Sequence, residues 1–135
     1  MTTYRSFVDG LEALVITGVV RRYTSGPPVG ASGVGDTPAQ YVRYPGGEEI
    51  AIVFGEQGGW PTLRAELVLL VEPVAQSMQG RNFDLTVDMM DNLSSALRAA
   101  ACMTRGKLHW SVRMAIDTVA GTDYWAVIAS VEGNG

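Results

Sequence analysis

The stretch from Leu63 to Ala101 decides the fold. It begins Leu-Arg-Ala-Glu-Leu-Val-Leu-Leu-Val-Glu-Pro-Val-Ala-Gln, continues Ser-Met-Gln-Gly-Arg-Asn-Phe, and ends in a long amphipathic segment. Apolar residues alternate along Leu63–Glu72, which predicts a strand, and from Phe83 onward they recur every three or four residues, which predicts a helix. At about 1.5 Å per residue the helix is about 30 Å long, enough to cross a small sheet.

The predicted helix, from about Phe83 to Ala101, carries a single apolar stripe. Asn82 is a suitable N-cap, and Arg98 lies toward the end where a cation suits the helix dipole. We expect the stripe to face the sheet. It consists of Phe83, Val87, Met90, Leu93, Leu97 and Ala100.

The remaining segments complete an α+β domain that we expect to span residues 1–135. The architecture predicted is a small, mostly antiparallel sheet of four to five strands, packed by an N-terminal helix and the one long helix. The segments are a helix over Tyr4–Val15 ended by Gly18, a short strand over Val19–Thr24, a hairpin of Gln40–Tyr44 and Glu49–Phe54 around Pro45-Gly46-Gly47, and a closing hairpin of Leu108–Asp117 and Tyr124–Val131.

Two glycine-rich segments are predicted to be loops. Ser25–Asp36 is a long Gly/Pro-rich loop, and loops of that length in small domains tend to be functional or disordered. Gly55–Pro61 carries Trp60, an aromatic residue suited to anchoring an interface. Neither loop ends in the Gly-Lys-Ser/Thr sequence of a phosphate-binding loop.

Composition excludes several classes of protein. The net charge of −4 and the scattered placement of ten basic residues argue against binding nucleic acid through phosphate contacts. A single cysteine rules out an internal disulfide or a cysteine-rich metal site. Because there is no basic leader and no long apolar run, we expect a soluble protein made in the cytoplasm, with no membrane partner.

The sequence holds few groups suited to catalysis. His109, the one histidine, shares a predicted strand face with Ser111 and Asp117, but neighbours on one face lie about 7 Å apart, too far for direct hydrogen bonds. Cys102 has no adjacent histidine or lysine to activate it. A solvated helix flank explains the acidic trio Asp84, Asp88 and Asp91 better than a cation site. We therefore expect no enzyme, no cofactor and no metal.

Two aliphatic side chains on the long strand need to be shielded from water. Leu63, Ala65, Leu67, Leu69 and Val71 form one apolar face, but Val68 and Leu70 lie on the opposite face, among Arg64, Glu66 and Glu72. A strand with one solvated face should be polar there. A helix or loop of the same chain could cover the pair, or a neighbouring subunit could do so.

Four strings of sequence, taken with the order of elements, resemble the tail terminator (tail completion) proteins of long-tailed bacteriophages. The resemblance covers roughly Thr37–Val131, with the N-terminal helix added by position. The strings are Thr37-Pro-Ala-Gln-Tyr-Val-Arg43, Ala65-Glu-Leu-Val-Leu-Leu-Val-Glu-Pro-Val74, Asn82-Phe83 followed by Thr86-Val-Asp-Met-Met-Asp-Asn-Leu93, and Tyr124-Trp-Ala-Val127.

The resemblance implies a structural virion protein, located in the tail or neck and assembled in the host cytoplasm. Such proteins form a ring, generally a hexamer, on the head-proximal end of the tail tube, where they stop tube growth and dock to the head connector. DNA passes through the lumen without specific binding. The partners implied are copies of the chain itself, the tail tube protein and the head–tail connector or stopper.

A ring needs surfaces that meet head to tail, and long loops that order against a partner suit it. Alternatives are a head-closure or connector ring of the same neck, a small α+β ligand-binding domain or enzyme, and a structural protein outside any virion. On the ring hypothesis Leu70→Glu impairs ring formation more than folding. The predicted interface residues are Val68, Leu70, Trp60, Pro27, Pro28, Val29 and Val34.

Overall fold

The computed structural model describes residues 3–24, 37–45, 51–53, 62–74, 79–100 and 108–134. Within them lie a six-stranded sheet and two helices, which confirms the α+β class, although the sheet has more strands than the four or five expected. The elements are α1 (Tyr4–Glu12), β1 (Arg21–Arg22), β2 (Ala39–Arg43), β3 (Ile52–Val53), β4 (Thr62–Pro73), α2 (Gln79–Ala99), β5 (Leu108–Val119) and β6 (Thr122–Asn134).

Strand β4 is the centre of the sheet. The strand order is β1–β2–β4–β6–β5, and β3 also pairs with β4. Only β1 and β2 pair in parallel among the described strands, so the sheet is mostly antiparallel, as predicted. The predicted strand over Leu63–Glu72 is confirmed, with one further residue at each end.

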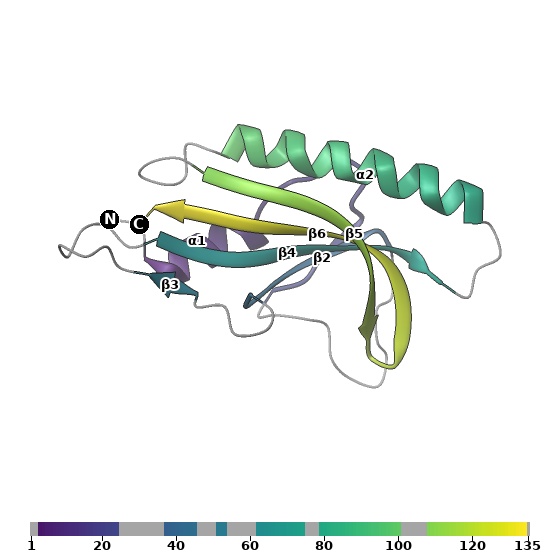
Figure 1. The fold of residues 1–135 in the computed structure, drawn as a ribbon, viewed down its shortest axis with the longest axis horizontal. Coiled ribbons are helices and arrows are strands. Elements are labelled where there is room, and N and C mark those ends of the chain that lie inside the picture. Colours follow the sequence, from purple (N-terminus) through teal and green to yellow (C-terminus); the bar gives the residue numbers. More distant parts are fainter. Residues whose placement is uncertain are drawn as a thin grey trace.

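Both helices lie on one face of the sheet (Figure 1). Helix α1 begins at a capping box in which Thr3 and Ser6 each bond the other's backbone N–H. Its Phe7 and Leu11 enter the main core beside the odd-numbered residues of β4, and α2 adds Leu93 to the same cluster. The apolar face predicted for β4 is therefore the face that both helices cover.

Helix α2 begins earlier and is rotated further than the sequence indicated. It starts at Gln79, so Asn82 is not its N-cap. Phe83 is 58% exposed and Val87 is 37% exposed, so these two members of the predicted stripe are wrong. The buried row is Thr86, Met89, Leu93 and Leu97.

The segment after α1 accounts for this rotation. Helix α1 ends at Glu12 rather than near Gly18, and the chain then crosses to α2, where the Asn92 side-chain amide donates to the Thr17 carbonyl at 2.9 Å. Gly18 has a φ of 93°, and a Cβ there would lie 3.1 Å from the Met89 sulfur. Close approach of this segment buries the Met89 flank of α2 and leaves the Phe83 flank outward.

The hairpin predicted around Pro45-Gly46-Gly47 does not form. Strand β2 pairs with β4 from Ala39↔Leu70 to Arg43↔Glu66, and β3 pairs with β4 at Ile52↔Leu63. Both strands run in the same direction along the same edge of β4, so together they act as one interrupted neighbour of β4. The proline and glycines at positions 45–47 indicated that a strand ends there. They did not indicate that the chain then turns back to pair with that strand.

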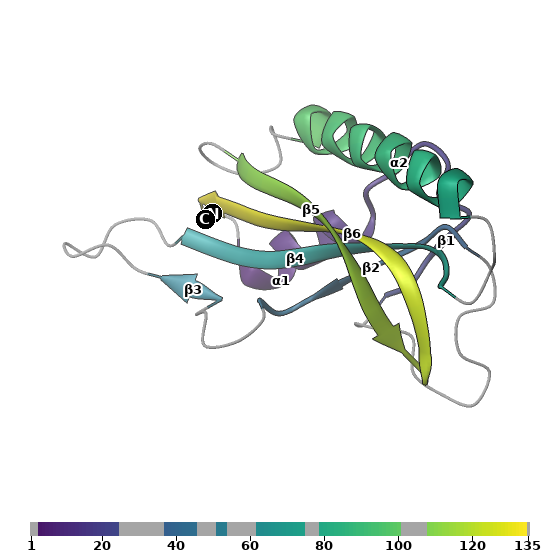
Figure 2. The same cartoon turned by 45° about the vertical axis from the view of Figure 1, so that its right-hand side comes forward.

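The closing hairpin is confirmed, and it is strongly bent. Strands β5 and β6 pair without interruption up to Val119↔Thr122. The φ values of 52° at Ala120 and 81° at Gly121 match a two-residue type I′ turn. The register of β6 against β4 shifts between Leu70 and Glu72, a bulge that increases bending and twist. Figure 2 shows the far half of the hairpin curving away from α2.

The turn makes a first prediction. Ala120 has a left-handed backbone conformation that disfavours a β-carbon but that asparagine tolerates, so Ala120→Asn should stabilise the fold by about 0.5–1 kcal/mol. Gly121→Ala, the matched control, should destabilise it by about 1 kcal/mol. Urea unfolding measures both changes, and a loss of stability in Ala120→Asn would contradict the type I′ assignment.

Candidate interaction surfaces

Five of the seven predicted interface residues lie outside the described part of the chain. Their assignment to an interface stays a prediction. They are Trp60, Pro27, Pro28, Val29 and Val34.

Val68 and Leu70 do not need a neighbouring subunit. Both side chains are wholly inaccessible in the single chain, so their assignment to a surface between subunits is corrected. They belong to a second apolar cluster, on the sheet face opposite the helices. The other buried members are Tyr41 on β2, Val119 near the hairpin turn, and Tyr124, Ala126 and Ile128 on β6.

The bend of the sheet is what buries Val68 and Leu70. Strands β2 and β5 are separated by β4 and β6 in the sheet order, yet Tyr41 and Arg43 on β2 both bond Asp117 on β5. The far half of the hairpin must therefore curl back over the face that carries Val68 and Leu70. Alternation along β4 identified the apolar pair, but it carried no information about curvature.

A polar network of Tyr41, Arg43, Glu66, Arg113 and Asp117 holds the bent hairpin against the sheet face. The Arg43 guanidinium bonds Glu66 at 2.8 Å and Asp117 at 3.0 Å, and so links three strands. Arg113 bonds Glu66 at 3.2 Å. The Tyr41 hydroxyl donates a hydrogen bond to Asp117. Glu66 is buried, and its carboxylate is paired with two arginines, which compensates its loss of hydration.

Two members of the network hold their protons more tightly than usual. Burial, with the hydrogen bond and negative charge of Asp117, raises the pKa of Tyr41 well above its ordinary value. Burial opposes the charge of Arg43, but hydrogen bonds to Glu66 and Asp117 outweigh it and raise the pKa of that guanidinium. Tyr41 is therefore a permanent donor and Arg43 a permanent cation. The arrangement suits a structural fastening rather than proton transfer.

The residues considered for catalysis are not brought together. His109 and Asp117 are eight residues apart on one strand, or roughly 25 Å at the usual rise. Asp117 is occupied by Tyr41 and Arg43, and Asp123 accepts a hydrogen bond from Thr118 beside the turn. Among the residues the structure describes, no three acidic, histidine or cysteine side chains gather as they would around a metal ion.

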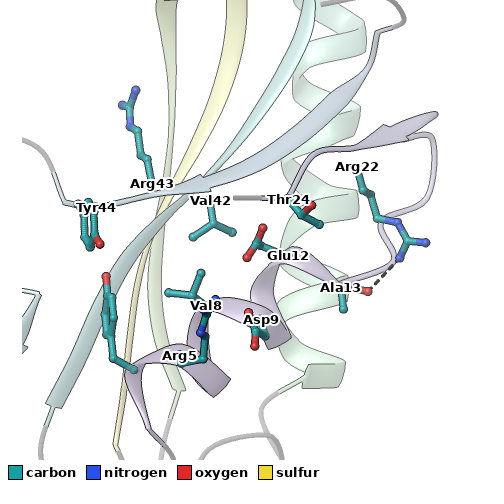
Figure 3. A pocket seen from close by; sticks show the side chains of 11 residues that line it. Arg5, Val8, Asp9, Glu12, Ala13, Arg22, Thr24, Val42, Arg43 and Tyr44 are labelled. Atoms are coloured by element: carbon teal, nitrogen blue, oxygen red, sulfur yellow. Dashed lines mark hydrogen bonds between the residues drawn. The ribbon is translucent and has the colours of Figure 1, made fainter. Parts of the chain in front are cut away.

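A groove runs between α1 and the outer edge of β2 (Figure 3), with a volume of about 1260 Å³. Val8 and Val42 point toward each other across it. The rings of Tyr4 and Tyr44 stack at one end, with centroids 6.1 Å apart and planes at 4°. At the other end the Arg22 side chain donates to the Ala13 carbonyl at 3.0 Å. An apolar floor with charged margins can hold a peptide segment or a small ligand.

The sequence did not reveal this groove. Tyr4 and Val8 lie on α1 at helical spacing from Phe7 and Leu11, and both pack partly against the main core. Their outer surfaces line the groove because β1 ends after two residues and leaves the outer edge of β2 beyond Gln40 without a partner among the described strands. Burial and the nearby Tyr44 hydroxyl raise the pKa of Tyr4, whose own hydroxyl donates to the Arg64 carbonyl.

Comparison with known proteins gives no relatives. No family model, no curated protein and no solved structure matches the chain. Within the described residues neither helix is long and apolar enough to cross a bilayer.

The burial of Leu70 makes a second prediction. Leu70→Ala should cost about 2–5 kcal/mol of unfolding free energy, because it leaves a cavity in a closed cluster. Leu70→Glu should unfold the monomer, which reverses the expectation from sequence. Val87→Ala, on the exposed flank of α2, is the control and should change stability by less than about 0.5 kcal/mol. Denaturant titration of the monomer tests all three, and a stable Leu70→Glu monomer would contradict internal burial.

The network makes a third prediction. Arg43→Ala should destabilise the fold by about 2–3 kcal/mol, because Glu66 and Asp117 each lose a partner and Glu66 has little access to water. Arg64→Ala removes an exposed pair with Glu132 at 3.7 Å and should cost about 0.5 kcal/mol at most. Equal effects of the two substitutions in thermal or urea unfolding would show that the network does not hold the hairpin.

Proposed function

We propose that this chain is a phage tail terminator, a structural protein that caps the head-proximal end of a tail tube as a ring and presents a surface to the head connector. The observation that carries the proposal is the order of elements. A helix, edge strands, a long central strand, a long helix and a long closing hairpin follow one another as the resemblance in sequence implies. Both helices lie on one side of a mostly antiparallel sheet.

The chemistry of the described residues supports a role in assembly. The buried and half-buried charges of Arg43, Glu66 and Asp117 are used to close the sheet. The single histidine, His109, stands apart from Asp117, the acidic residue considered with it. A protein that works by shape needs peripheral contact surfaces, and the described part of the chain offers exposed apolar groups on the Phe83 flank of α2 and at Ile116 on β5.

A ligand-binding domain is the second candidate, and the groove beside α1 favours it. The groove has the size and mixed lining of a small-molecule site. Its charged side chains do not converge on one point: Figure 3 shows Arg43 directed away from Val42, and Arg22 bonded to the Ala13 carbonyl at the far end. We therefore rank it below the assembly role.

Deleting the protein from a phage distinguishes a tail terminator from a head-closure or connector ring. In a phage that lacks it, a tail terminator predicts tubes of uncontrolled excess length, because nothing stops polymerisation. A head-closure or connector ring predicts tails of normal length that fail to join heads. Electron microscopy of lysates from the deletion and from the complemented strain distinguishes the two. Normal virions from the deletion would overturn both roles.

A surface variant makes a fourth prediction. Phe83→Glu should impair tail capping while leaving the unfolding free energy within about 0.5 kcal/mol, because the side chain is largely exposed. Asp91→Lys, on the exposed side of the same helix, is the control for altered charge. Complementation of the deletion scores capping, and full activity of Phe83→Glu would remove this flank from the candidate ring contacts.

A further inference from the structure

Strand β5 has a free edge, and the structure shows which of its backbone groups lie on that edge. The alternation of apolar and polar residues along the strand did not show this. The strand is twelve residues long and lies at the end of the strand order, with β6 as its one neighbour among the described strands. Natural proteins protect such edges with proline, bulges or charged side chains, and of these β5 has the charges of Arg113 and Asp117. Here the register with β6 runs unbroken from Leu108 to Val119, and β5 contains no proline.

The turn fixes which backbone groups face outward. In a two-residue hairpin the closing pair, here Val119 and Thr122, exchanges hydrogen bonds, and hydrogen-bonded pairs then alternate along the ladder. The odd-numbered residues of β5 therefore point their N–H and C=O groups at β6. Even-numbered residues, among them Met114 and Ile116, point theirs outward. The same alternation across the sheet agrees with the Tyr23 N–H donating to the outward Gln40 carbonyl.

We propose that β5 is a docking edge for a second copy of this chain, paired antiparallel about a two-fold axis through Ala115. In this register Met114 lies opposite Ile116 of the second copy, and Arg113 lies opposite its Asp117. Each pairing occurs twice, as an isologous contact requires. The proposal goes beyond the role in tail capping and does not rest on it.

Hydrogen bonding and charge together select the register. Only pairings of even with even residues bring outward groups together, so the two-fold axis must pass through a residue. An axis at Arg113 sets two arginines face to face, which is unfavourable. Axes at Met114 and Ile116 leave both charges without an opposite partner. The axis at Ala115 sets Arg113, which is half-exposed, against Asp117, whose carboxylate has lone pairs beyond those used by Tyr41 and Arg43.

The apolar side of the edge fits the same register. Even-numbered residues of β5 share the sheet face of the helices, but the bend carries the far half of β5 away from α2 (Figure 2) and leaves Ile116 54% exposed. Across the axis, Met114 and Ile116 of both copies form a continuous apolar row. From Val112 to Thr118 about eight backbone hydrogen bonds join the copies.

Sedimentation velocity over a concentration series tests the surface. The wild-type chain should dimerise, and Ile116→Lys should raise the dimer dissociation constant at least about tenfold. Val15→Lys, at a residue 76% exposed on a different part of the molecule, should leave it unchanged. Circular dichroism checks that the variants are folded. A wild-type monomer at every concentration, a ring without a dimer, or a dimer insensitive to Ile116→Lys would overturn the proposal.

Cysteine cross-linking tests the register in a Cys102→Ser background. Ala115→Cys should form a covalent dimer on oxidation, because a residue on the axis meets its own copy at disulfide distance. Ser111→Cys, on the same strand face, should not, since its partner is Val119. If Ala115→Cys does not fold, mixed Val112→Cys and Thr118→Cys chains should cross-link, and neither should alone. Cross-linking by Ser111→Cys alone would overturn the register, whatever the outcome for tail capping.

Discussion

From Leu67 to Val71 every side chain of β4 is inaccessible to solvent, so both faces of the sheet must be covered along the same stretch of strand. The helices cover one face. The chain has no third helix among its described residues, and it covers the other face by bending the sheet on itself. The bulge near Val71 permits the bend, and Asp117 fastens it by bonding Arg43 and Tyr41. Burial of each leucine contributes about 1.5–3 kcal/mol, which outweighs the local distortion.

The sequence predicted elements better than their arrangement. Period-two and helical patterns identified β4, α2 and the closing hairpin, because those patterns follow from local geometry that each segment satisfies by itself. The false hairpin between β2 and β3 came from turn residues, which mark a break without saying which strand pairs next. The apolar stripe of α2 was predicted about one residue away, around the helix, from the row that is buried. The sequence could not separate the two, since Phe83 and Val87 are as apolar as Met89. Only contact with the segment around Gly18 decides which flank is buried.

The candidate surfaces were less accessible to sequence reasoning. Val68 and Leu70 were correctly singled out as aliphatics that need cover, but alternation cannot say whether the cover comes from the same chain. The network joins residues as distant as Arg43 and Asp117, and no spacing rule links them. The groove beside α1 arises from the early end of β1. Each of these features depends on curvature or strand order, which are properties of the whole sheet.

The internal position of Val68 and Leu70 changes where a ring contact can lie. If those side chains are used within the subunit, contacts in a ring must come from the periphery, where the described residues include the Phe83 flank of α2 and the groove beside α1. The free edge of β5 serves the separate two-fold contact proposed above. Each region is exposed for its own reason: the segment around Gly18 turns the Phe83 flank outward, the early end of β1 opens the groove, and the bend that closes the second apolar cluster draws β5 away from α2. A substitution that relaxes the bend would therefore disturb folding and association together. Substitutions confined to Phe83 or Ile116 leave the fastening at Arg43 intact, so a loss of assembly in them reports on the surface itself.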